Sequence, residues 1–355
     1  MAPGDHGTEL ISVINGSASA PLSSPMPLPT VLVTEVIRSS QQGESHGGAH
    51  LVNLETGVHE RVLDWDEMGI DWSGRGGGRG LRGIAFHNDK VVIGAGNEIF
   101  LFDKHFTLLS SHPAPYCRDC HEIFADGDRL LITATGFDSL LEFDLSALEY
   151  TAGMRFVVKP TKVNGPQGPV TVPMVHGEAF DPSKPGGPPQ NDTLHINMVW
   201  HERGHTFICG TTMTALLMSP AGRSLADRAG LMRPIARVPE WTHNARPYGG
   251  GAIYNSTKGE RIVHSDARGN GIRSLAIPRF PRDELVNDGV PEDHARPDFG
   301  RGLTVTEHEG RAVVIGSSSP STITAYDLES GDVLARVNLT ADVRNAPHGL
   351  EVWPF

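Results

Sequence analysis

The chain of 355 residues has only three cysteines, at positions 117, 120 and 209. This is too few for a disulfide scaffold, and an odd number is unusual for an exported protein. Residues 1–29 lack a basic segment followed by a continuous apolar core, so we expect a disordered tail there rather than a signal peptide. These absences predict a cytoplasmic protein.

Long apolar runs and an excess of positive charge are missing too. No run of roughly 18 consecutive apolar residues occurs, so we expect no membrane span. The formal net charge is −12, with 42 acidic and 30 basic side chains. The chain therefore gives no electrostatic reason to expect nucleic-acid binding.

Glycine, proline and short strand-like segments are abundant, with 41 glycines and 26 prolines. A recurring unit has a short strand, a polar turn, a second apolar strand, a Gly/Ser/Thr loop and a third strand that often ends in Asp. Copies begin at residues 82, 121, 195, 243 and 301. Four-stranded units repeated every roughly 40–50 residues are the signature of a β-propeller.

The two ends of the chain complete one more unit. The C-terminal segment 348–355 is typical of a first strand with nothing after it, whereas residues 30–65 indicate later strands without a first. We therefore predict an all-β fold: one six-bladed β-propeller over residues 30–355, closed by residues 30–65 joining the strand 348–355. A Pro/Gly-rich stretch, 159–193, is expected to be a loop inserted between two blades.

The first strand of each propeller blade lines the central channel, and a polar residue stands at its opening position in every unit. These ring positions hold His348, Arg82, His121, His195, His243 and Arg301. Burying so many large polar side chains without a partner would be costly. Neutral imidazoles favour Fe, Zn, Cu or Ni over Ca or Mg. We therefore predict that the four histidines hold a transition metal, with Fe²⁺ as the leading interpretation and Zn²⁺ or Cu as alternatives.

Residues 117–121 form Cys-x-x-Cys-His, the attachment pattern of c-type haem. His121 is already explained as the start of an inner strand, and covalent haem is normally installed after export, so no haem is expected. The cysteine pair also lacks a second Cys/His pair for a zinc site. Two incidental thiols are favoured over a redox role.

Further polar residues are candidates for the other roles at the ring. The guanidinium groups of Arg82 and Arg301 suit a carboxylate, sulfate or phosphate, so we expect them to bind a small anionic substrate and to assist catalysis. Arg246 and Arg79 are additional substrate-binding candidates. His348 is either the fourth metal ligand or a general base. The expected outer partners that orient the ligands are Glu122, Asn197, Asn244 and Asp138.

Several segments resemble a known family. "CHEI…TGFDS", "THNARP", "GRGL…GSSSPST" and "HGLEVWPF" are similar to bacterial propeller proteins that have no assigned activity, over most of residues 30–355. This resemblance implies the fold but no reaction. In site design alone, a four-histidine axis is similar to the iron site of carotenoid-cleavage oxygenases, and a three-histidine zinc site resembles the peptidyl-amidating lyases. The wider motifs of both families are missing.

Three functions stay open at this point. The leading one is a metal-dependent oxidoreductase whose iron-type centre activates oxygen on a small anionic substrate. The alternatives are a zinc-dependent lyase or hydrolase and a non-catalytic propeller that binds a ligand or a partner. The fold by itself does not choose among them.

Overall fold

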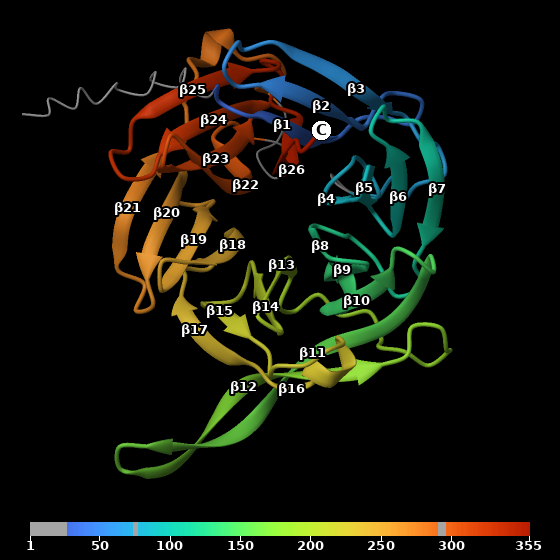
Figure 1. The fold of residues 1–355 in the computed structure, drawn as a ribbon, viewed down its shortest axis with the longest axis vertical. Helices are drawn as coiled ribbons and strands as arrows, with labels where there is room; N and C mark the ends of the chain where they lie inside the picture. Colours follow the sequence, from blue (N-terminus) through green and yellow to red (C-terminus); the bar gives the residue numbers. More distant parts are fainter. Residues whose placement is uncertain (1–26, 74–76, 290–295) are drawn as a thin grey trace, which may run out of the picture.

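The computed structural model describes residues 27–73, 77–289 and 296–355. Across these ranges the strands form six sheets, and the other regular elements are three 3-10 turns. Figure 1 shows the six sheets arranged around a central axis. This all-β arrangement is consistent with the predicted β-propeller. Of the predicted tail 1–29, residues 1–26 lie outside the described part of the chain.

The first sheet contains both the N-terminal and the C-terminal strands. In it β1 (Thr30–Ile37) pairs with β26 (Asn345–Val352) on one side and with β2 (Gly47–Asn53) on the other, and β3 (His59–Trp65) follows β2. Residues 30–65 therefore share a sheet with the C-terminal strand, as the sequence predicts. That strand begins at Asn345 rather than at His348.

Four of the other sheets have four strands each, in chain order from the axis outward. The second consists of β4 (Ile84–His87), β5 (Lys90–Ala95), β6 (Glu98–Asp103) and β7 (Leu108–Pro113). The fourth consists of β13 (Ile196–Glu202), β14 (His205–Gly210), β15 (Ala215–Met218) and β17 (Arg233–Arg237). The fifth consists of β18 (Thr242–Tyr248), β19 (Gly251–Ser256), β20 (Arg261–Asp266) and β21 (Gly271–Ala276). The sixth consists of β22 (Phe299–His308), β23 (Arg311–Ser319), β24 (Thr322–Asp327) and β25 (Val333–Asn338).

The third sheet is larger and contains six strands. They are β8 (Ile123–Asp126), β9 (Arg129–Ala134), β10 (Ser139–Asp144), β11 (Glu149–Gly165), β12 (Gly168–Phe180) and β16 (Gly230–Leu231). The 3-10 turns are η1 (Thr135–Phe137), η2 (Ala226–Arg228) and η3 (Arg282–Glu284). Within the described residues, no helix is long and apolar enough to span a bilayer.

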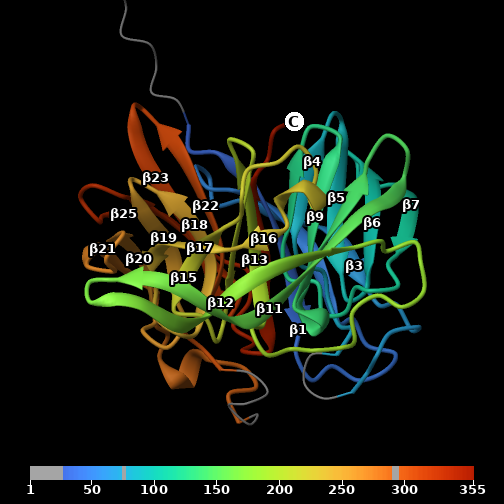
Figure 2. The same ribbon diagram turned by 90° about the horizontal axis from the view of Figure 1, so that it is seen from below.

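The predicted loop 159–193 is wrong for residues 159–180, which belong to the long hairpin of β11 and β12. Its far part reaches beyond the ring in Figure 1 and runs across the outside of the molecule in Figure 2. Pro160 lies opposite Pro173 in this two-stranded part, where each strand has an open edge that tolerates a missing N–H. Residues 181–193 do form a loop.

The hydrophobic core lies between neighbouring sheets, in six clusters of the described residues. Successive side chains of a strand point to opposite faces, so a strand between two neighbours is apolar on both faces. In β9, Leu130 and Ile132 pack toward the second sheet, whereas Leu131 packs toward the fourth. This double burial explains the continuous apolar runs in the sequence.

Two glycines allow the inner strands to approach each other at the axis. A Cβ atom on Gly83 would lie 2.6 Å from the backbone nitrogen of Ile123, and one on Gly349 would clash with the carbonyl oxygen of Arg82. Each glycine directly follows a ring residue, Arg82 or His348. The absence of a side chain therefore permits the close contacts that bring the ring residues together.

Candidate metal centre

Irregular strand pairing accompanies the ring positions. The register of β18 with β19 shifts between His243 and Arg246, and that of β22 with β23 shifts between Arg301 and Leu303. The pairings of β13 with β14 and of β26 with β1 also shift near their ring residues. Such bulges re-aim side chains out of the regular pleat. These bulges allow the side chain of each ring residue to point in a different direction from the apolar side chains that follow it in the inner strand.

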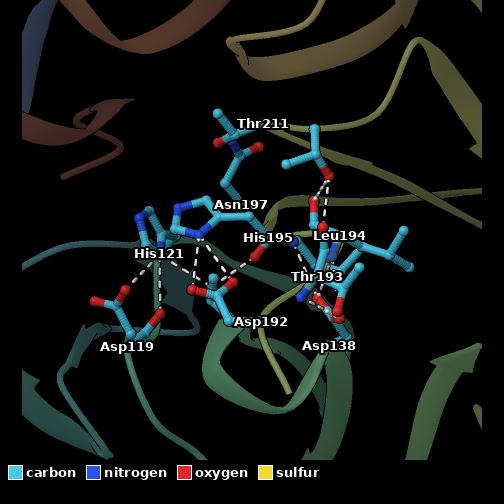
Figure 3. Close-up of polar contacts among 12 residues, drawn as sticks. Asp119, His121, Asp138, Asp192, Thr193, Leu194, His195, Asn197 and Thr211 are labelled. Carbon is cyan, nitrogen blue, oxygen red and sulfur yellow. Dashed lines mark hydrogen bonds and ion pairs between the residues drawn. The ribbon is translucent and has the colours of Figure 1, made fainter.

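Asp119, His121 and His195 form the candidate metal-binding group. Each offers one ligand atom, and these atoms all lie within 4.8 Å of one another. Asp119 and His121 precede β8, and His195 precedes the inner strand of the next sheet, β13. The two imidazole rings are 5.1 Å apart between centroids and meet edge to face. Figure 3 shows the three side chains side by side.

Both imidazoles have one nitrogen fixed by an oxygen. Nδ1 of His121 lies 2.8 Å from the carbonyl oxygen of Asp119 and therefore donates to it; the Thr135 hydroxyl is 3.0 Å away. Nδ1 of His195 lies 2.9 Å from the carboxylate of Asp192 (Figure 3). A proton on Nδ1 leaves the Nε2 lone pair for a metal, and oxygen partners of this kind orient metal-binding histidines.

Electrostatics keeps the group in the protonation state that a metal requires. Burial lowers the pKa of His121 well below its ordinary value, and the nearby Arg82 guanidinium lowers it further, so the ring is neutral. Burial alone would raise the pKa of Asp119, but the charge of Arg82 and its hydrogen bond to the carboxylate outweigh burial and hold this pKa below its usual range. A neutral imidazole and an ionised carboxylate are the binding forms.

Arg82 orients the Asp119 carboxylate. Its Nη1 donates to Oδ1 of Asp119 and, at 3.1 Å, to the carbonyl oxygen of Cys120. The other carboxylate oxygen, Oδ2, lies 4.0 Å from Nδ1 of His121. The two oxygens therefore face different partners, one the guanidinium and the other the imidazole. Arg82 was predicted to bind substrate, and these contacts give it a positioning role as well.

The other two predicted histidine ligands lie outside this group. His348 is buried with its ring centroid 5.8 Å from that of His121. Its pKa is lowered well below the ordinary value by burial and by nearby arginines, Arg301 first. Nδ1 of His243 bonds the Thr257 hydroxyl at 2.8 Å, and its buried Nε2 has no partner among the described residues. The structure thus groups two of the four histidines with a carboxylate.

Asp119 is the ligand candidate that sequence reasoning missed. It stands in the loop between the two cysteines, before β8 begins, and it has a left-handed backbone with a φ of 58°. The one available signal was a carboxylate two positions before a ring histidine. A repeat-based reading considers only the first residue of each inner strand, so it does not reach this position.

A cavity of about 1340 Å³ opens beside the candidate group. Five of the six ring residues line it: Arg82, His121, His195, Arg301 and His348. Arg301 also approaches the ring of Phe299, with its Cζ 4.9 Å from the centroid. Asp119 and a further guanidinium, that of Arg38, line the same cavity. The candidate metal-binding group and several cationic side chains therefore line one space.

Arg246 and Glu122 belong to a buried ionic network rather than to the cavity lining. Arg246 Nη2 lies 3.3 Å from Glu122 and 2.6 Å from Glu351. Burial raises the pKa of Glu122 to about 7, although Arg246 opposes the rise. The Arg246 guanidinium also stacks over Trp200 at 5.0 Å. These two carboxylates hold the Arg246 guanidinium, and its substrate-binding role stays a prediction.

The remaining candidates mostly bind the backbone. Arg79 donates to the carbonyl oxygens of Ser40 and Trp72, each at 3.0 Å. Nδ2 of Asn197 donates to the carbonyl oxygen of Thr242 at 3.0 Å. Oδ1 of Asn244 accepts from the N–H of Gly302 at 3.0 Å. These three side chains hold the loops and strands around the axis; none of them contacts the ligand rings through a hydrogen bond among the described residues.

Asp138 supports the segment that leads into β13. Its carboxylate accepts from the backbone N–H groups of Thr193, Leu194 and His195 at 2.8 to 3.0 Å (Figure 3). The predicted role as an outer partner therefore takes a specific form: Asp138 fixes the backbone of His195, whereas Asp192 holds the ring.

Cys117 and Cys120 are buried, and neither forms a disulfide. The pKa of Cys117 is raised well above its ordinary value, first by a hydrogen bond with Cys120 and then by burial. Both thiols also pack in the apolar cluster between the second and third sheets. A buried thiol with a raised pKa is unreactive, so the cysteine pair contributes to packing.

Comparisons with known proteins support the propeller-like fold. A protein of unknown function from Bacteroides caccae is 11% identical, with 90% of this chain and 99% of that chain covered and a TM-score of 0.50. A chain of a nidogen/laminin complex is 10% identical over 90% of this chain and 97% of its own, with a TM-score of 0.53. Apo AztD from Citrobacter koseri is 10% identical over 92% of this chain and 98% of its own, with a lower TM-score of 0.44.

No protein-family model and no curated protein matches the chain. Because the structural likenesses are so distant in sequence, they bear on the fold alone. Function depends on the residues of the site rather than on the fold.

Proposed function

We propose that this protein is a closed six-bladed β-propeller that binds a transition metal ion through Asp119, His121 and His195. The pairing of β1 with β26 and the apolar clusters between neighbouring sheets support closure. The observation that carries the metal proposal is the placement of three ligand atoms within 4.8 Å of one another. Their donor chemistry, two imidazoles and one carboxylate, suits a transition metal better than Ca²⁺ or Mg²⁺.

The donor set favours iron chemistry. Two histidines and one carboxylate, with the remaining positions open, are the ligands of non-haem Fe(II) centres that activate oxygen. We therefore retain an oxygen-activating oxidoreductase that acts on an anionic substrate as the leading function. When bound, iron would supply the oxygen chemistry, whereas zinc would polarise water or a carbonyl group. A zinc-dependent lyase or hydrolase is the second candidate, since a His₂-carboxylate set is also a catalytic zinc site.

The residues of the chain prepare the site for either metal. Arg82 directs one oxygen of Asp119 away from the imidazoles, so that the other oxygen is presented toward them. Asp192 holds the His195 ring, and Asp138 holds its backbone. Rigid support of this kind sets ligand geometry and contributes to metal affinity. Arg301 and Arg38 add positive charge to the adjacent cavity, where an anionic substrate would bind.

Metal analysis tests the proposal. Protein purified without added metal is reconstituted anaerobically with Fe(II) or Zn(II), dialysed and analysed by inductively coupled plasma mass spectrometry. We expect about one ion per chain. The His195→Ala and Asp119→Asn variants should lose it, with unchanged far-ultraviolet circular dichroism.

The His87→Ala variant is the matched control. His87 lies 2.7 Å from Asp128, so it is also a histidine paired with a carboxylate, and it does not line the cavity. Metal retention in His195→Ala, or equal loss in His87→Ala, would refute the assignment. Oxygen consumption by the iron-loaded protein with candidate anions then separates the two functions, because a zinc enzyme consumes none.

A further inference from the structure

We propose that the cavity binds an amphipathic organic anion, whose carboxylate or phosphate lies beside His348 and whose apolar body lies against Trp65 and Phe100. This inference rests on the proposed function, because it names the substrate class of the metal site. It also revises the size of the substrate predicted from the sequence, which was a small anion. Four observations carry it: the unsatisfied His348 ring, the arginines around it, an aromatic wall, and the volume of the cavity.

His348 is a buried polar side chain without a hydrogen-bond partner among the described residues. It is 6% exposed, lines the cavity and lies next to the His121 ring, with 5.8 Å between centroids. Its ring nitrogens are not among the fully buried unpartnered atoms, so the ring is open to the cavity. An oxyanion in the cavity would accept a hydrogen bond from this ring and would place the molecule beside the metal group.

Guanidinium groups surround the same part of the cavity. The Cζ atoms of Arg301 and Arg38 lie 4.9 and 6.0 Å from the centroid of one ring, that of Phe299, and both residues line the cavity. Arg82 lines it as well. Planar guanidinium groups match carboxylate and phosphate oxygens in geometry and charge. The anionic end of a ligand therefore belongs on this side.

Five carboxylates also line the cavity, those of Glu67, Asp71, Glu98, Asp119 and Asp192, so the positive charge is local to the part around His348. Asp119 is bonded to Arg82, and Asp192 is bonded to His195. Asp71 accepts from the backbone N–H of Ser73 at 2.9 Å and lies 3.3 Å from Arg118. Asp71, Asp119 and Asp192 are therefore engaged within the protein, and the largest charge effects on His348 come from the guanidinium groups of Arg301, Arg82 and Arg38.

Aromatic side chains form another part of the cavity wall. Trp65 and Phe100 both line it, with ring centroids 4.8 Å apart in an edge-to-face contact. Phe137 and Ile70 line it as well. The volume of about 1340 Å³ exceeds the roughly 300–1,000 Å³ of typical small-molecule sites. An inorganic ion or acetate would leave most of this space and the aromatic wall unused, whereas an aryl or branched alkyl body would cover it.

Isothermal titration calorimetry of the metal-loaded protein with four probes tests the ligand class. The probes are phenylacetate, phenyl phosphate, acetate and the neutral phenylacetamide. We expect phenylacetate or phenyl phosphate to bind at least tenfold more tightly than acetate and phenylacetamide, and the better of the two identifies the anionic group. Equal affinity for phenylacetamide would overturn the role of the charge, and equal affinity for acetate would overturn the role of the aromatic wall.

Variants assign the two ends of the ligand. His348→Gln should weaken phenylacetate at least fivefold, because the orientation of the donor changes, and should leave the metal content unchanged. Trp65→Ala should weaken phenylacetate but not acetate. His264→Ala is the control, since His264 is also a histidine with a ring nitrogen, Nε2, that has no partner in the described structure, but it packs against Tyr248 outside the cavity. An equal effect of His264→Ala would overturn the assignment.

Failure of the metal site can be separated from failure of the anion site. The same probes are titrated into His195→Ala, in which the proposed metal is removed. If neither the wild type nor the variant holds metal and both still bind the anion, the result supports this subsite and refutes the metal function. Stoichiometric metal with no binding of any anion would overturn this inference alone.

Discussion

One carboxylate, that of Asp138, holds the three backbone N–H groups that lead to His195. The Asp138→Asn substitution removes the charge and turns one acceptor oxygen into a donor that faces N–H groups. We expect metal affinity to fall about tenfold, the lower end of the effect of outer partners, while the His195 ring itself is untouched. A competition titration against a chromogenic chelator measures the change.

The Asp266→Asn variant is the control for Asp138→Asn. Asp266 also accepts from backbone N–H groups, those of Arg268 and Asn270 at 2.8 and 2.9 Å, but it does so in the turn between β20 and β21. Its substitution should destabilise that turn and leave metal affinity unchanged. If both variants weaken metal binding alike, Asp138 acts through general stability rather than through His195.

Glu122 makes the stability of the protein depend on pH. Burial raises its pKa from 4.5 to about 7 in the folded protein. The folded state therefore keeps the proton that the unfolded state loses first, and the stability this contributes below pH 4.5 is lost as the pH rises toward 7. A rise in pKa from 4.5 to about 7 corresponds to about 3 kcal/mol.

The Glu122→Gln variant should remove this pH dependence. Urea denaturation of wild type and variant at about pH 5 and about pH 8 measures it, and the variant should lose less of its free energy of unfolding between the two. The Glu149→Gln substitution, at an exposed carboxylate, serves as the control. The same pH dependence in wild type and Glu122→Gln would show that the proton is not held at Glu122.

The sequence was informative about residues wherever a repeat fixes their position. His121 and His195 were identified because each opens an inner strand, and the strand pairing puts equivalent positions around one axis. Asp119 was not, because its placement depends on a left-handed loop residue and a guanidinium from the neighbouring sheet. Such contacts join residues that no local pattern relates.

At the scale of elements, the hairpin of β11 and β12 is the part of the fold that the sequence did not predict. The segment has the Pro and Gly content of a loop, yet β11 and β12 pair without a break from Gly153 to Gly165 and from Gly168 to Phe180. Composition failed here because the three prolines of these strands, Pro160, Pro169 and Pro173, all fall where the ribbon has only two strands. The inner strands, in contrast, were predicted from their repeated pattern and begin within a few residues of the expected positions.

The projecting part of this hairpin should be dispensable for the metal site. Replacing residues 160–173 by a two-residue Asn-Gly turn removes only the two-stranded part, whose Val170 is about half exposed. We expect thermal unfolding to change by a few degrees at most and metal stoichiometry to stay the same. Differential scanning calorimetry and metal analysis check this.

A matched change inside a blade should behave differently. Shortening the hairpin of β9 and β10 by the same approach would remove Leu131 and Leu140, which are buried between the third and fourth sheets. This variant is expected to lose cooperative unfolding. If shortening the projecting hairpin abolishes folding as well, that hairpin is part of the core after all.

At the scale of the whole molecule, the two ends of the chain predicted a shared sheet because each end has the strands that the other end lacks. The C-terminal segment has an inner strand without later strands, and residues 30–65 have later strands without an inner one. In the structure β1 pairs with β26 along most of its length. The pairing residues on β26 include Leu350, which is buried with Val33 in the cluster between the first and sixth sheets. The C-terminal strand is therefore as much a part of the core as any internal strand.

Removal of that strand should affect distant parts of the ring. Truncation after Arg344 deletes β26, exposes the inner edge of the first sheet and removes His348 from the cavity. We expect the truncated protein to lose its cooperative thermal transition, because the clusters that the first sheet forms with the second and the sixth both lose apolar partners. Truncation after Pro354 deletes only Phe355, which is 43% exposed, and should leave the transition within a few degrees of wild type. A cooperative transition retained after deletion of β26 would show that the ring does not depend on closure by its own C-terminus. If the transition is lost, adding a synthetic peptide of residues 345–355 should restore it.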